Sequence, residues 1–100
     1  MTSTVLYATG ANHWMGVEAV GGRLKLHVHH LVFTSHAFNI QNHELVVARG
    51  DIAEAHETRL SWVSKTLTIH LHSGGVERFV IPKRTEWVAR LSAPDITPEG

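Results

Sequence analysis

The chain has 100 residues, of which 43% are hydrophobic and 18% are charged, so it can bury the core of one ordinary domain. Nine basic and nine acidic residues give a formal net charge of zero, which argues against nucleic acid as a partner. The absence of cysteine excludes disulfides, thiolate nucleophiles and cysteine metal sites.

Alternation of apolar and polar residues predicts strands along most of the chain. Residues 5–8 are read as a brief strand or an irregular arm. A strand at 16–20 then leads into a turn formed by Gly21 and Gly22. In the next strand Leu24, Leu26 and Val28 face one side. The predicted strands are 16–20, 23–29, 31–36, 44–48, 67–72 and 76–81.

Residues 51–58 fit two descriptions. Asp51, Glu54 and Glu57 recur every three residues, as on a helix, but Ile52 is the only large apolar residue there to bury. A bulged strand is therefore favoured over a helix.

The only clear helix is predicted at 83–92. Trp87, Val88 and Leu91 form one apolar stripe, and Pro94 follows the end of the pattern. Six or seven strands and one terminal helix predict a curled sheet whose open mouth is covered by the helix. We expect a single domain over 1–100, with its core at about 10–92 and a flexible tail at 93–100.

The sequence resembles GRAM domains, which belong to the pleckstrin-homology-like superfold. The resemblance covers about residues 10–92. Downstream it includes Asp51 and Ile52, the strand around Ile69, Phe79 and the helix that carries Trp87. His27 and His30 stand where the family usually has Thr and Arg. The opening signature consists of Gly22, Leu24, Leu26, His27, His30, Leu31, Val32 and Phe33.

The resemblance implies a mainly β fold, a bent barrel of about seven antiparallel strands capped by one C-terminal α-helix. Family members in larger eukaryotic proteins bind phosphoinositides or other anionic lipids, or act as protein-interaction modules. For a compact bacterial subgroup, which this chain is similar to around Asn12 and Phe38, the resemblance implies no established activity. Fold does not by itself fix function.

One candidate site is a basic strand face beside the predicted Gly21–Gly22 turn. Arg23, Lys25, His27 and His29 alternate with apolar residues and so share that face. They suit an anionic lipid surface, although the alternative is an ordinary solvated face. Two permanent cations contribute only about 2 kcal/mol of attraction. The attraction is expected to rise in acid, as histidines gain charge.

A second candidate site is a group of amides and imidazoles that could line a small-molecule pocket. The alternative is that these side chains hydrogen-bond to backbone groups that lack strand partners. The group consists of Asn12, His13, His36, Asn39 and Gln41.

The nine histidines raise the question of metal binding. His70 and His72 stand two apart on a predicted strand, and His56 is the best third ligand. No fourth ligand is evident, so neither a metal site nor a cofactor is expected.

Catalysis has little support, and we expect the protein not to be an enzyme. Ser35 and His36 are neighbours on a strand, so their side chains point to opposite faces and cannot act as nucleophile and base. The sequence therefore favours a non-catalytic binding module that associates with itself or with another protein. Trp14 and Trp62 are candidate contact residues. Anionic lipid binding, and small-molecule or metal binding, remain as alternatives.

The location is expected to be cytoplasmic. Residues 2–9 lack the pattern of a signal peptide, and no apolar run is long enough to span a membrane.

Overall fold

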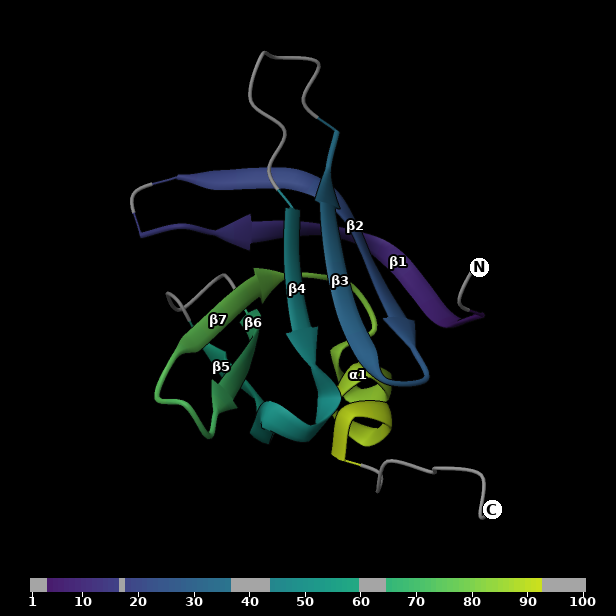
Figure 1. Cartoon of the computed structure of the whole chain (residues 1–100). Coiled ribbons are helices and arrows are strands. Elements are labelled where there is room, and N and C mark those ends of the chain that lie inside the picture. Colours follow the sequence, from purple (N-terminus) through teal and green to yellow (C-terminus); the bar gives the residue numbers. More distant parts are fainter. Residues whose placement is uncertain (1–3, 17, 37–43, 60–64, 93–100) are drawn as a thin grey trace, which may run out of the picture.

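The computed structural model describes residues 4–16, 18–36, 44–59 and 65–92. It contains one sheet of seven strands and one C-terminal helix (Figure 1). The elements are β1 (Val5–Trp14), β2 (Ala19–His27), β3 (His30–Ser35), β4 (Glu44–Ala48), the 3₁₀ turn η1 (Arg49–Asp51), β5 (Ile52–Arg59), β6 (Lys65–Leu71), β7 (Val76–Val80) and α1 (Arg84–Ser92).

All neighbouring strands run antiparallel, in the order β4-β3-β2-β1-β7-β6-β5. The sheet is bent but not closed, and β4 and β5 are its two edges. The predicted mainly β fold with a single C-terminal helix is confirmed. The two halves of the sheet meet where β1 pairs with β7, through only three pairs of residues centred on His13 and Phe79.

The prediction for the N-terminal part was wrong in two places. Of the two alternatives for residues 5–8 the strand is right, but it runs on to residue 14. Of the described residues in the strand predicted at 16–20, only 19 and 20 belong to a strand, as the start of β2. Gly21 and Gly22 lie inside β2, opposite Asn12 and Ala11 of β1.

Close packing between β2 and β3 explains why a glycine is required within a strand. A Cβ atom on Gly22 would lie 2.2 Å from the carbonyl oxygen of Thr34 and 2.8 Å from the ring of Phe33. Gly22 therefore allows close backbone approach, not a turn. The turn lies at residues 28–29, between β2 and β3.

The bulged strand predicted at 51–58 is confirmed as β5. Its pairing with β6 shifts register between Ile52 and Glu54, which is the mark of a bulge. The strand begins directly after η1, whose Asp51 also holds the β6–β7 turn. The carboxylate of Asp51 accepts hydrogen bonds from the Ser73 backbone N–H at 3.1 Å and from the Ser73 hydroxyl at 2.9 Å.

Trp87 is the centre of the core, as its position on the helix predicted. Its side chain is fully buried, and its indole Nε1 donates to Thr9 Oγ1 at 3.0 Å. The ring of Tyr7 meets the indole edge-on at a centroid distance of 4.8 Å. Since α1 also contacts β5 and β6, the helix joins the two halves of the sheet. The other core side chains are Ala11, Leu24, Leu26, Leu31, Phe33, Val47, Ala55, Leu67, Ile69, Phe79, Ile81 and Leu91.

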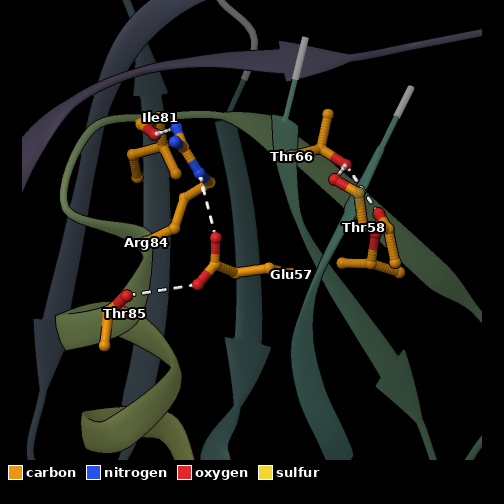
Figure 2. A network of polar contacts seen from close by, with 7 residues as sticks. Glu57, Thr58, Thr66, Ile81, Arg84 and Thr85 are labelled. Carbon is orange, nitrogen blue, oxygen red and sulfur yellow. Dashed lines mark hydrogen bonds and ion pairs between the residues drawn. The ribbon is translucent and has the colours of Figure 1, made fainter. Parts of the chain in front are cut away.

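Polar contacts hold the start of α1 against β5 (Figure 2). The Glu57 carboxylate accepts from Arg84 Nε at 3.4 Å and from the Thr85 hydroxyl at 3.2 Å, and Arg84 Nη1 donates to the Ile81 carbonyl at 2.7 Å. On the other face of β5, the hydroxyl of Thr58 is hydrogen-bonded to the hydroxyls of two buried threonines on β6. The oxygen–oxygen distances are 2.7 Å to Thr66 and 2.6 Å to Thr68. The hydroxyls therefore partner one another.

Candidate functional site

The predicted basic face is only partly formed. Arg23 and Lys25 lie on the outer face of β2, opposite Thr34 and Val32 of β3. His27 ends the strand, and His29 lies in the turn that follows, so it does not continue the row. The expected four-residue face beside a glycine turn is therefore wrong. The cause is that β2 already contains Gly21 and Gly22, ends at His27, and is followed by the turn at residues 28–29.

The β2–β3 turn instead gathers three histidines, since His27, His29 and His30 border it. The exposed side chains of Val5 and Leu6 lie at the same end of the molecule, because Val5 is opposite His27 in the register. Within the described residues, the buried Nδ1 atom of His27 has no hydrogen-bond partner.

Arg49 fixes this turn to the end of the helix. Its backbone N–H donates to the carbonyl of His29 at 2.9 Å, and its guanidinium donates to the carbonyls of Val28 at 3.2 Å and Arg90 at 3.3 Å. The guanidinium of Arg90 lies 4.2 Å above the ring of Tyr7. The turn is thus held by hydrogen bonds from Arg49 to backbone carbonyls, which the sequence of the turn alone does not indicate.

The predicted group of amides and imidazoles is divided between the two faces of β1. His13 points into the core, whereas the neighbouring Asn12 is exposed on the outer face. His36 is exposed just beyond β3, where its backbone N–H donates to the carbonyl of Gly21 at 2.9 Å. Asn39 and Gln41 lie outside the described residues, so the prediction for them is not tested. The pocket is not formed by Asn12 and His13 together, because adjacent residues of a strand face opposite sides.

His13 is the one polar core residue with a carboxylate partner among the described residues. Its side chain is only 6% exposed, and Nε2 lies 2.8 Å from the Glu77 carboxylate of β7. The imidazole stacks on Phe79 with a centroid distance of 4.8 Å, and Phe33 lies 5.4 Å away on another side. This arrangement joins β1 to β7 and favours a structural role. Sequence reasoning missed Glu77, because the partner comes from a strand 64 residues further on.

The three histidines weighed as metal ligands are not brought together. His56 and His70 lie on neighbouring strands with ring centroids 5.1 Å apart, but His72 is in the turn after β6. His56 Nδ1 is instead paired with the Glu54 carboxylate at 3.1 Å. Across the described ranges, no three histidine, aspartate or glutamate side chains are grouped so as to hold a metal ion.

The two edges of the sheet differ sharply in protection. Edge strand β5 contains a bulge, carries Glu54, Glu57 and Arg59, and is contacted by α1. Edge strand β4 is regular, is charged only at its first residue, Glu44, and exposes 56% of Val46, the largest exposed fraction among the large apolar side chains described. Proteins ordinarily protect a free edge with bulges, charges or covering elements. The sequence predicted strand 44–48 correctly, but not that it would be an edge.

The contact surface expected around tryptophans is only partly testable. Trp14 ends β1 and is half-buried, and Trp62 lies outside the described residues. None of the helices described is long and apolar enough to cross a membrane.

Solved structures similar to this chain in fold include the following two. The C-terminal domain of an unknown protein from Leishmania infantum has a TM-score of 0.77 at 14% identity, covering 89% of this chain and 81% of that one. The Vps36 N-terminal PH domain has a TM-score of 0.67 at 13% identity, covering 89% of this chain and 79% of that one.

These likenesses show that the chain has a pleckstrin-homology-like fold. A shared fold does not fix function, so the function has to be argued from the site. The sequence matches no family model and no curated protein, so its relation to GRAM domains stays a resemblance.

Proposed function

We propose that the protein is a non-catalytic binding module that works through protein–protein contact, and that its first partner is a second copy of the same chain. The observation that carries this proposal is the regular edge strand β4, whose middle residue Val46 is apolar and exposed. A regular free edge with an exposed apolar side chain is a ready template for pairing with another strand. Val46 is therefore the residue whose replacement should matter most.

The test is sedimentation velocity over a concentration series reaching the high micromolar range. The unmodified protein should associate reversibly, and Val46→Lys should weaken that association at least about tenfold, or about 1.4 kcal/mol. A lysine on an edge strand opposes pairing by charge and solvation. Val76→Lys is the matched control, since Val76 is also exposed but lies on β7 inside the sheet order. A strict monomer throughout the series contradicts the proposal.

Binding to an anionic lipid surface is a second candidate, supported by the end of the molecule around the β2–β3 turn. Three histidines and the nearby Lys25 gather there beside exposed Val5 and Leu6, so a lysine, imidazoles and apolar side chains occur together. Attraction to an anionic surface is worth about 1 kcal/mol per cation. Acid should strengthen it, because histidine is the side chain that ordinarily gains charge between pH 8 and 5.

Co-sedimentation with anionic and neutral vesicles, at about pH 7.5 and about pH 5.5, tests this candidate. Binding should rise in acid with anionic vesicles only, and His29→Ala/His30→Ala should remove the rise. His72→Ala is the control, because His72 is exposed in a different turn. An acid-induced rise that persists in the double variant, or no rise in a protein that circular dichroism shows to be folded, contradicts lipid binding at this turn.

A further inference from the structure

The backbone of β4 offers its free hydrogen-bonding groups at three defined residues. The Arg49 N–H donates to the His29 carbonyl at 2.9 Å, in the register that continues through β4 and β3. In an antiparallel ladder, hydrogen-bonded pairs alternate along the strand. Leu45 and Val47 therefore bond to β3, whereas the N–H and C=O groups of Glu44 and Val46 and the N–H of Ala48 point away from the sheet. The carbonyl of Ala48 is used by η1, because Ala48 is the N-cap of that turn.

The same three residues place their side chains on the outer face. Val46 lies directly opposite Val32, which in turn lies opposite Lys25, so a short apolar row runs inward from the edge. Glu44 lies at one end of β4 and is opposite Thr34, whereas Ala48 lies at the other end and is opposite His30. The edge thus has an apolar centre, an acidic end, and an end with a small residue beside an imidazole.

We propose that two copies pair antiparallel along β4 about a two-fold axis at Val46, joining their sheets into one. This inference rests on the proposed self-association and specifies its geometry. With Val46 at the axis, Val46 faces Val46 of the second copy, and Glu44 faces Ala48. An isologous contact of this kind is self-complementary and closed.

The chemistry of the edge suits this register. The central Val46 pair exchanges two backbone hydrogen bonds, and in each outer pair the Ala48 N–H donates to the Glu44 carbonyl, so about four backbone hydrogen bonds form. On the outer face, Val32 and Val46 of one copy meet Val46 and Val32 of the other in a continuous apolar strip. Cross-strand apolar pairs of this kind add stability.

The ends of the two strands are complementary as well. Glu44 of one copy lies beside Ala48 of the other, and beyond that small side chain lies His30. An imidazole N–H can donate to a carboxylate in either protonation state of the ring. A shift of the register by one residue would lose both the Val46–Val46 contact and the contact of Glu44 with Ala48, because residues that face each other would then carry their side chains on opposite faces.

Cysteine cross-linking tests the register directly, because the chain has no cysteine of its own. Val46→Cys should form a disulfide-linked dimer under mild oxidation. An equimolar mixture of Glu44→Cys and Ala48→Cys should give the mixed dimer. Glu44→Cys alone should not, since two copies of residue 44 would be about 14 Å apart along the strands, and a disulfide needs Cα atoms within about 7 Å.

Val76→Cys is the control for random collision, because it is exposed away from the edge. Cross-linking of Val46→Cys should be at least about tenfold faster than that of Val76→Cys, because association raises the effective concentration of the two thiols. If the protein associates in the sedimentation series but Val46→Cys is no faster than the control, the β4 arrangement is wrong and the proposed function stands. If the protein does not associate at all, both fail. Cross-linking of Glu44→Cys with itself at the rate of Val46→Cys would replace this register with another.

Discussion

His13 Nε2 and Glu77 Oε1 lie 2.8 Å apart across the place where the two halves of the sheet meet. Only three residue pairs join β1 to β7, and His13 belongs to the middle one. The imidazole also stacks on Phe79, its partner in the register. A polar side chain in the core thus contributes both a hydrogen bond and ring packing where two neighbouring strands share the fewest residue pairs.

His13→Ala should therefore lower the free energy of unfolding by about 2–4 kcal/mol, from the lost packing and the lost hydrogen bond. Urea denaturation followed by circular dichroism measures the change. Glu77→Gln is the control, because an amide oxygen can still accept from the imidazole, and it should cost less than about 1 kcal/mol. Equal losses in the two variants would contradict a packing role for the imidazole.

Two glycines on neighbouring strands should respond to alanine with opposite signs. Gly22→Ala places a methyl group 2.2 Å from the Thr34 carbonyl oxygen, a backbone atom, so β2 and β3 must separate. We expect a loss of about 3 kcal/mol or more. Gly10→Ala meets its nearest atom at 3.9 Å and should gain about 0.5–1 kcal/mol, because alanine loses less backbone freedom on folding. Thermal denaturation of both variants tests the pair. A Gly22→Ala protein as stable as the parent would mean that this close approach is not required.

Trp87→Ala should cost about 3–5 kcal/mol, since it empties the largest site in the core. Domains are stable by about 5–15 kcal/mol, so the variant should be largely unfolded or close to it. Trp87→Phe keeps most of the ring but removes the donor to Thr9, so it should cost less. Chemical denaturation of both variants decides the matter, and unchanged melting of Trp87→Ala would contradict the position of the helix.

Much of the fold could be predicted because periodicity is a local property of the sequence. The alternation around Leu24 and Leu26, the bulged strand at 51–58 and the apolar stripe of the helix all appear within a few residues of each other. One prediction failed because glycine occurs both in turns and inside strands that pack closely together. Gly21 and Gly22 were read as a turn, but Gly22 serves the approach of β3, which only the folded register reveals.

The candidate sites were less predictable because they depend on pairing between distant strands. His13 was named as one member of a group of amides and imidazoles, but its partner Glu77 and its stacking on Phe79 require the β1–β7 register. Likewise, strand 44–48 was predicted without any indication that it is an edge, which is set by the order of all seven strands. The strand predicted at 23–29 was also too long. In the structure β2 ends at His27 and the turn occupies residues 28–29, so His29 is separated from Arg23 and Lys25.

The last prediction concerns Tyr7, the only tyrosine in the chain. Partial burial raises the pKa of Tyr7 above its ordinary value of 10.0, and the charge of Glu86 and its hydrogen bond to the phenol, at 3.3 Å, raise it further. The guanidinium of Arg90 opposes this by lowering the pKa. Because the folded pKa lies above the unfolded one, the folded state holds the proton more tightly. The resulting stability is fully present below pH 10 and is lost as the pH rises through the folded pKa.

Titration of the phenolate by ultraviolet difference absorbance, from neutral to strongly alkaline pH, measures this pKa directly. Glu86→Gln should lower the pKa of Tyr7, because it removes the negative charge that disfavours the phenolate. Arg90→Ala should raise it, because it removes a cation 4.2 Å from the ring centroid. Both shifts should shrink at high salt, since this contact is near the surface. If the two variants move the pKa in the same direction, the contacts among Tyr7, Glu86 and Arg90 are not as the structure has them.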